Sequence, residues 1–112
     1  MILVLIQKTK VYHQYFEKKY DFISPTKNLQ TSSVNKSIKY VKMGKVKEAE
    51  KALRPAVNQL IKKKCKKIIL GCTELPIALF AYKSFKKAKD SKLFIDPNLL
   101  LAQVCMRKYK NN

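Results

Sequence analysis

The sequence is poor in acidic residues and in arginine. Of its 112 residues, seven are acidic and 25 are basic, which gives a formal net charge of +18. Such a charge invites a nucleic-acid or anionic-membrane interpretation. Arg54 and Arg107 are the only arginines, however, and arginine is the residue that makes bidentate contacts to phosphates and base edges. We therefore expect a lysine-rich solvated surface, no specific nucleic-acid partner, and weak, salt-sensitive attraction to polyanions.

The cysteine and histidine content excludes several kinds of site. The three cysteines, Cys65, Cys72 and Cys105, are odd in number and irregularly spaced, which does not suit a disulfide framework. There is no Cys-x-x-Cys pair, and the only histidine, His13, is remote in sequence, so we expect no metal site. Free thiols indicate a reducing compartment.

Long hydrophobic runs are also absent. No segment is long enough to cross a bilayer. The opening run Ile2 to Ile6 is too short for a signal peptide, and its charges follow it instead of preceding it. We therefore expect a cytoplasmic protein with no membrane partner. The length suits one domain, spanning residues 1–112.

Strand-like and helix-like segments alternate along the chain. Short apolar runs predict strands at Ile2 to Ile6, Asp21 to Ser24, Lys67 to Leu70 and Lys92 to Ile95. Helical spacing of apolar residues predicts helices at Lys10 to Tyr20, Ser37 to Met43, Val46 to Lys64, Ile77 to Phe85 and Leu99 to Lys108. The alternation predicts βα units, and hence an α/β fold with a parallel sheet.

Two segments depart from this regular pattern. Lys27 to Lys36 is polar and irregular, so we expect a loop there. Pro55 lies inside the long predicted helix, which it should kink or split near Arg54. The last predicted helix is amphipathic, and we expect its Cys105 to lie in the core.

The stretch KIILGCTELP, residues 67–76, is the most informative part of the sequence. Ligands of open parallel sheets bind outside the carboxyl ends of the strands, and Cys72 lies two residues past a predicted strand. Gly71 permits a tight turn or the close approach of a ligand, and Thr73 is a suitable N-cap for the next helix. The amides and dipole of that helix would favour a Cys72 thiolate and could hold a substrate carboxylate.

A thiolate in this place suits two kinds of chemistry. It can attack an electrophile, or it can remove a proton from a carbon next to a carboxylate. Attack would need a base, and His13 falls on a predicted helix with no neighbouring carboxylate. A third interpretation, common for an unpaired cysteine after a strand, is a buried structural residue.

The residues Ile69 to Pro76 resemble the second cysteine motif of the aspartate/glutamate racemase family, in its aspartate racemase branch. Gly44-Lys45-Val46, Phe94-Ile95-Asp96-Pro97 and Thr9 to Tyr12 resemble further segments of the later half of that family's fold. The resemblance implies a three-layer parallel-sheet lobe, equivalent to one of two lobes that enclose the site. It also implies a cofactor-independent racemase, in which two cysteines work from opposite faces of the substrate.

The resemblance assigns roles to four residues. Cys72 matches the second acid/base cysteine, and Thr73 matches a substrate-contacting position. Glu74 matches an acidic position of the aspartate branch, although it could instead be a solvated residue that complements the helix dipole. Gly71 completes the substrate-binding turn. No pyridoxal phosphate and no metal are implied.

The first cysteine of the family has no counterpart in this sequence. Cys65 precedes its strand, at the opposite end of the sheet from Cys72, and the chain resembles only the later half of the family fold. We therefore expect an isomerase by descent, truncated to the half that bears Cys72, acting on a small acidic amino acid such as aspartate. A missing lobe or a homo-oligomer would be its partner. The alternatives are an inactive remnant or carboxylate-binding or partner-binding module, and a lysine-rich non-specific nucleic-acid binder.

Overall fold

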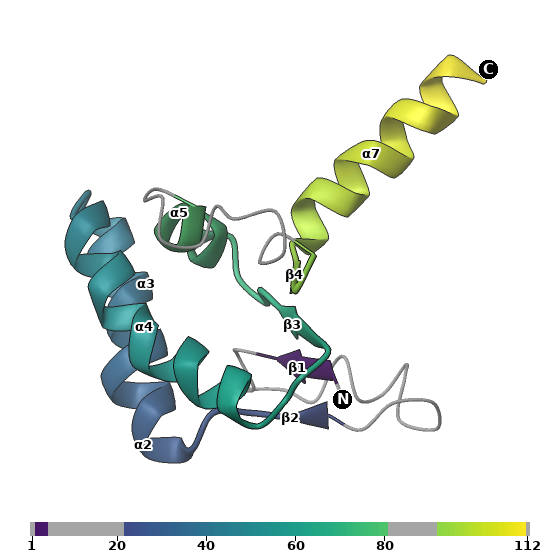
Figure 1. Cartoon of the computed structure of the whole chain (residues 1–112). Coiled ribbons are helices and arrows are strands. Elements are labelled where there is room, and N and C mark those ends of the chain that lie inside the picture. Colours follow the sequence, from purple (N-terminus) through teal and green to yellow (C-terminus); the bar gives the residue numbers. More distant parts are fainter. Residues whose placement is uncertain (1, 5–21, 81–91, 112) are drawn as a thin grey trace.

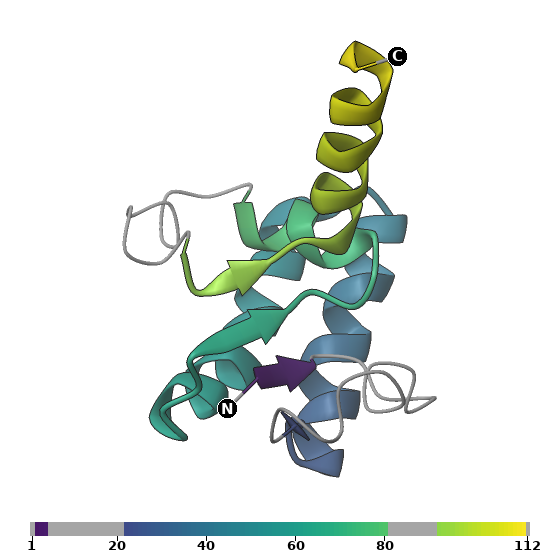
Figure 2. The same cartoon turned by 90° about the vertical axis from the view of Figure 1, so that its right-hand side faces the viewer.

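A small parallel sheet organises the chain. The computed structural model describes residues 2–4, 22–80 and 92–111. Its strands are β1 (Ile2–Val4), β2 (Phe22–Ile23), β3 (Lys67–Ile69) and β4 (Phe94–Ile95). They form one sheet in the order β2-β1-β3-β4, and every neighbouring pair is parallel. Figure 2 shows β1, β3 and β4 pointing in one direction. The predicted parallel sheet is confirmed.

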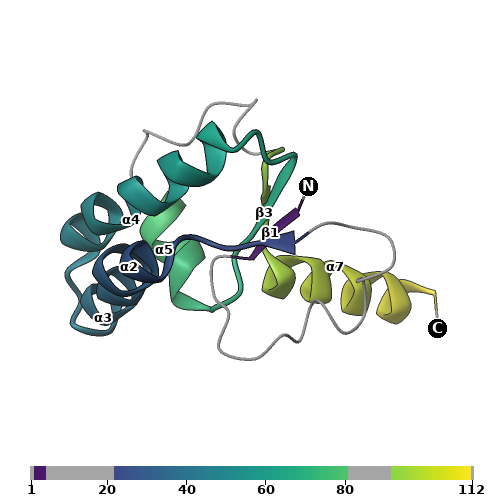
Figure 3. The same cartoon turned by 90° about the horizontal axis from the view of Figure 1, so that it is seen from below.

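The helices are α2 (Lys27–Leu29), α3 (Lys36–Lys42), α4 (Val46–Lys62), α5 (Glu74–Phe80) and α7 (Pro97–Lys110), and a π-helical stretch, η1 (Gln30–Asn35), joins α2 to α3. Helices α2 to α5 gather on one side of the sheet, whereas α7 runs away from them (Figures 1 and 3). The fold is therefore mixed α/β and mostly helical. The predicted helix Lys10 to Tyr20 and residues 81–85 of another lie outside the described residues, so the three-layer arrangement stays a prediction.

The hydrophobic core lies between β3 and the helices α4 and α5. Its buried residues come from η1, α4, the end of β3 and α5, and include Val34, Leu53, Leu60, Ile68, Leu70, Leu75 and Leu79. Leu53 and Leu60 of α4 and Ile68 of β3 belong to apolar patterns that the sequence predicted, whereas Val34 lies in the predicted loop. The core thus fixes β3 against α4 and α5, and with it the turn between β3 and α5.

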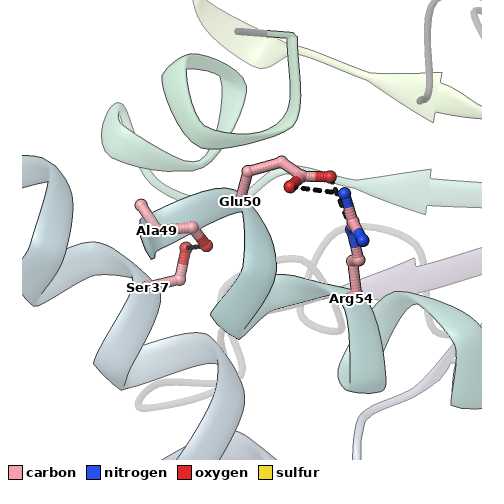
Figure 4. A network of polar contacts seen from close by, with 4 residues as sticks. All are labelled: Ser37, Ala49, Glu50 and Arg54. Atoms are coloured by element: carbon pink, nitrogen blue, oxygen red, sulfur yellow. Dashed lines mark hydrogen bonds and ion pairs between the residues drawn. The ribbon is translucent and has the colours of Figure 1, made fainter. Parts of the chain in front are cut away.

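The predicted loop at Lys27 to Lys36 is wrong. The segment is helical throughout, beginning at the N-cap Thr26, whose Oγ1 accepts a hydrogen bond from the Leu29 N–H at 3.4 Å. Its polar residues are not all solvated, because Ser33 is 1% exposed, and just beyond the segment Ser37 is fully buried. The Ser33 hydroxyl donates to the Ala52 carbonyl and the Ser37 hydroxyl donates to the Ala49 carbonyl at 2.7 Å (Figure 4). Tertiary hydrogen bonds to α4 therefore override a polar composition that is typical of loops.

The predicted split of α4 at Pro55 is also wrong, because the helix is continuous from Val46 to Lys62. Proline removes one rung of the helical ladder. Next to it, the Ser33 hydroxyl accepts a hydrogen bond from the Ala56 N–H at 3.2 Å while donating to the Ala52 carbonyl. Pro55 itself faces solvent. A hydroxyl from η1 thus bridges two backbone groups of α4 beside the proline.

One buried carboxylate is paired within α4. Glu50 is only 2% exposed, and its two oxygens accept hydrogen bonds from Arg54 Nε at 2.7 Å and Nη2 at 2.8 Å (Figure 4). This bidentate geometry is the strong form of the arginine–carboxylate pair. The pairing raises the pKa of Arg54, first through the hydrogen bonds and then through the charge of Glu50. The i,i+4 spacing places the Arg54 guanidinium directly against the buried Glu50 carboxylate.

Helix α3 ends where the sequence predicted. Gly44 has a φ of +74°, the left-handed conformation that glycine adopts most readily.

Helix α7 is confirmed as a helix, but none of its residues is buried. The expectation that Cys105 lies in the core is wrong, because Cys105 is exposed on α7. None of the helices in the described part of the chain has the length and apolar character that a bilayer crossing requires.

Candidate active site

The turn between β3 and α5 carries the four residues that the sequence singled out. β3 ends at Ile69, and the buried Leu70 leads to Gly71 and Cys72, which are half-buried. Thr73 is exposed, and α5 begins at Glu74, three residues earlier than predicted. Since β3 is parallel to its neighbours, this turn lies at the carboxyl edge of the sheet, where ligands of such sheets bind. The predicted position of Cys72 is confirmed.

The polar side chains of the turn donate hydrogen bonds to a single carboxylate oxygen. The Cys72 thiol donates a hydrogen bond to Glu74 Oε2, and the Thr73 hydroxyl donates to the same oxygen at 3.0 Å. The Leu75 N–H donates to the Cys72 carbonyl at 3.3 Å, which closes the turn at the start of α5. Three consecutive side chains thus converge on one point. The Glu74 carboxylate is therefore bonded within the turn and is not only solvated.

The environment keeps Cys72 protonated at rest. Burial raises the pKa of the Cys72 thiol, and the hydrogen bond to the Glu74 carboxylate raises it further. The backbone N–H groups of Glu74 and Leu75 act in the opposite direction, as the helix N-terminus predicted, but their effect is smaller. The expectation of a stabilised thiolate is therefore wrong, because a neighbouring carboxylate and desolvation outweigh the helix amides.

The partner carboxylate is correspondingly anionic. The hydrogen bond from Cys72 is the largest cause that lowers the pKa of Glu74, followed by its own backbone N–H, the Thr73 hydroxyl and the charge of Lys42, while burial opposes them. The proton of the pair therefore rests on sulfur and is hydrogen-bonded to the Glu74 carboxylate. The pair has the arrangement of a donor and an acceptor for proton transfer.

Lys42 is the site residue that the sequence did not single out. It ends α3, which packs against α5, and its charge acts on Glu74. Nothing in the local pattern distinguishes Lys42 from the many other lysines. Only the packing of α3 against α5 brings this ammonium group to the carboxyl edge of the sheet. A cation beside the turn suits an anionic substrate.

The other two cysteines lie away from the turn. Cys65 is buried just before β3, at the opposite end of the strand from Cys72, as predicted. Burial raises the pKa of Cys65. Cys105 is exposed on α7. Within residues 2–4, 22–80 and 92–111, the turn therefore holds Cys72 as its one thiol.

Comparison with known proteins identifies the family. No curated protein matches this chain. A model of the Asp/Glu/Hydantoin racemase family matches residues 4–105, a range that includes the Cys72 turn and nearly all the described elements. Racemases of this kind are isomerases, and the match supports enzymatic function of that general class. The chain belongs to the Asp/Glu/Hydantoin racemase family.

Proposed function

We propose that this chain carries one half of the active site of a cofactor-independent amino-acid racemase, with Cys72 as the acid/base thiol. The observation that carries the proposal is the hydrogen bond from the Cys72 thiol to Glu74 at the carboxyl edge of the sheet. The proposed substrate is a small acidic amino acid such as aspartate. The charge of Lys42 and the net charge of +18 favour the approach of such an anion.

The proposed reaction moves one proton on each face of the substrate. On its own face, Cys72 passes its proton to Glu74, and the resulting thiolate removes the α-proton as the Cα–H bond breaks. In the reverse direction, the Cys72 thiol protonates the carbanion at Cα, and Glu74 returns a proton to sulfur. Thr73 holds the shared oxygen of Glu74 in place through its hydroxyl. The proton travels through protein groups alone, without pyridoxal phosphate or metal.

Inversion needs a second acid/base on the other face of the substrate. Cys65 cannot supply it because it lies at the opposite end of β3. The resemblance to the later half of the family fold leads us to propose that a second lobe, on another chain or in a homo-oligomer, supplies this group. Alone, the Cys72 half would exchange an α-proton with solvent on one face.

The alternative is a carboxylate-binding module without turnover. It is favoured by the single thiol of the described turn and by the raised pKa of Cys72, since a thiol that stays protonated is a poor base.

Proton NMR of L-aspartate in D₂O separates the two functions. We expect the α-proton signal to decay with the wild type and to persist with Cys72→Ser. Line broadening of aspartate without any loss of the α-proton signal would favour the binding module instead. Glutamate and asparagine, run in parallel, test whether the side-chain carboxylate and its distance from Cα decide recognition.

A further inference from the structure

The helices α2 to α4 carry a positive charge that the proposed racemase site does not use. Residues 27–62 contain eight lysines and one arginine against two glutamates. Arg54 is paired with the buried Glu50, and Lys42 acts on Glu74. The remaining lysines have Glu48 as their only acidic neighbour in this segment. A ligand of this surface would have to be anionic.

The surface of α3 and α4 contains two adjoining hollows. One, of about 350 Å³, is lined by residues of η1, α3 and α4 that include Lys36, Tyr40, Lys51 and Pro55. The other, of about 290 Å³, is lined by Lys36, Lys39, Tyr40 and Met43. Lys36 and Tyr40 line both hollows, so the two adjoin at these side chains and are treated together as a groove. We name it the Tyr40 groove.

An aromatic ring lies at the centre of the Tyr40 groove. Tyr40 is half-buried and packs against the core. The Lys36 ammonium lies 5.9 Å from the centroid of its ring. A lysine ammonium on a flexible stem is easily displaced, and its displacement would free this ring face for a flat ligand group and the ammonium for an anion. A basic groove with an aromatic platform is the arrangement by which proteins hold single strands of nucleic acid.

We propose that the Tyr40 groove binds single-stranded nucleic acid without sequence preference, with Tyr40 stacking on a base and Lys36, Lys39 and Lys51 neutralising phosphates. The ring favours a strand over a simple polyanion, because a polyanion without bases gains nothing from it. The shortage of arginine fits the lack of sequence preference, since lysine contacts phosphates as a point charge. Glu48 lines the same groove and repels phosphate.

The role of the lysines is tested by fluorescence anisotropy of a labelled twelve-nucleotide oligothymidylate at several salt concentrations. Each phosphate neutralised on a single strand contributes about −0.7 to the slope of log K against log salt. The triple variant Lys36→Gln, Lys39→Gln, Lys51→Gln should therefore lose about 2 from the magnitude of the slope. The matched variant Lys66→Gln, Lys108→Gln, Lys110→Gln should lose much less. Equal losses would overturn the proposal in favour of diffuse charge.

The aromatic test separates stacking from charge. Tyr40→Leu should weaken oligothymidylate binding at least about fivefold, the lower end of the measured range for stacking, whereas Tyr40→Phe should retain it. Tyr109→Leu on α7, which removes a tyrosine that is 77% exposed, is the matched control. Circular dichroism confirms that each variant is folded.

Two further measurements complete the aromatic test. The affinity for heparin, which has no bases, should be the same in the wild type and Tyr40→Leu. Glu48→Gln should tighten oligothymidylate binding, because it removes the negative charge that repels phosphate. If Tyr40→Leu and Tyr109→Leu behave alike, or if Tyr40→Leu weakens heparin equally, the stacking site is refuted.

Discussion

Ser33 offers the sharpest test of how α4 passes through a proline without interruption. Its hydroxyl bridges the Ala52 carbonyl and the Ala56 N–H beside Pro55, and Ser33 is 1% exposed. Replacing Ser33 with alanine leaves these two groups in the interior without the bridge. A buried polar group that loses its partner costs about 1–3 kcal/mol. Direct pairing of the Ala56 N–H with the Ala52 carbonyl would recover part of that cost, so we expect a net loss of about 1–3 kcal/mol for Ser33→Ala.

Urea unfolding followed by circular dichroism measures this loss. For a chain of this length, each kcal/mol corresponds to roughly 4 °C in Tm, so a thermal melt should fall by roughly 4–12 °C. Ser32→Ala is the matched control, because the Ser32 hydroxyl donates to the Asn28 carbonyl at 2.9 Å on an exposed surface. Its effect should stay within about 0.5 kcal/mol.

A double-mutant cycle with Pro55→Ala tests the cause of the Ser33 effect. Restoring an N–H at position 55 repairs the ladder, so the Ala56 N–H can pair within the helix. The cost of Ser33→Ala should then fall by at least about 0.5 kcal/mol, a coupling typical of residues in one network. A Ser33→Ala effect as small as that of Ser32→Ala would refute the bridge. An equal cost in both backgrounds would show that the hydroxyl does not compensate for the proline.

Three further outcomes follow from the site and the fold. Glu74→Gln should lower the pKa of Cys72, because the amide accepts the thiol hydrogen bond less strongly and does not repel a thiolate. The pH profile of thiol alkylation should therefore shift to lower pH. An unchanged profile would contradict the contact between Cys72 and Glu74. Because the pKa of Cys72 is raised in the folded state, the stability it contributes is present below the ordinary thiol value of 9.0 and is lost as the pH rises from there through the folded value; across that pH interval, urea unfolding should therefore show a steeper loss of stability in the wild type than in Cys72→Ser. Gly44→Ala should cost about 1 kcal/mol for the left-handed backbone alone, since a Cβ at Gly44 meets nothing within 4 Å; a neutral effect in a thermal melt would show that the turn relaxes.

Local patterns predicted the framework of the fold well. The strands β1 to β4 and the helices α3 and α4 lie close to where the sequence patterns placed them, and α4 and β3 bury apolar residues that those patterns mark. The end of α3 at Gly44 followed from the conformational freedom of glycine. These features depend on short-range signals, which a single sequence carries in full.

The failed prediction of a loop depends on contacts between segments distant in sequence. The polar stretch from Lys27 to Lys36 is helical because the Ser33 hydroxyl finds a backbone carbonyl on α4, 19 residues away. Likewise, the sequence placed Cys72 correctly but gave the wrong direction for its pKa. Desolvation depends on how the turn packs, and it acts together with the hydrogen bond to Glu74, two residues along the chain, to outweigh the helix amides. Lys42 reaches the site only through the packing of α3 on α5.

The most direct measurement of the central claim is deuterium incorporation at Cα of L-aspartate in D₂O, followed by mass spectrometry. The wild type, Cys65→Ser and Cys105→Ser should all incorporate one deuterium, because Cys65 is at the far end of β3 and Cys105 is exposed on α7. Cys72→Ser should incorporate none. Incorporation that survives in Cys72→Ser, or that disappears equally in Cys65→Ser, would contradict the assignment of proton transfer to Cys72.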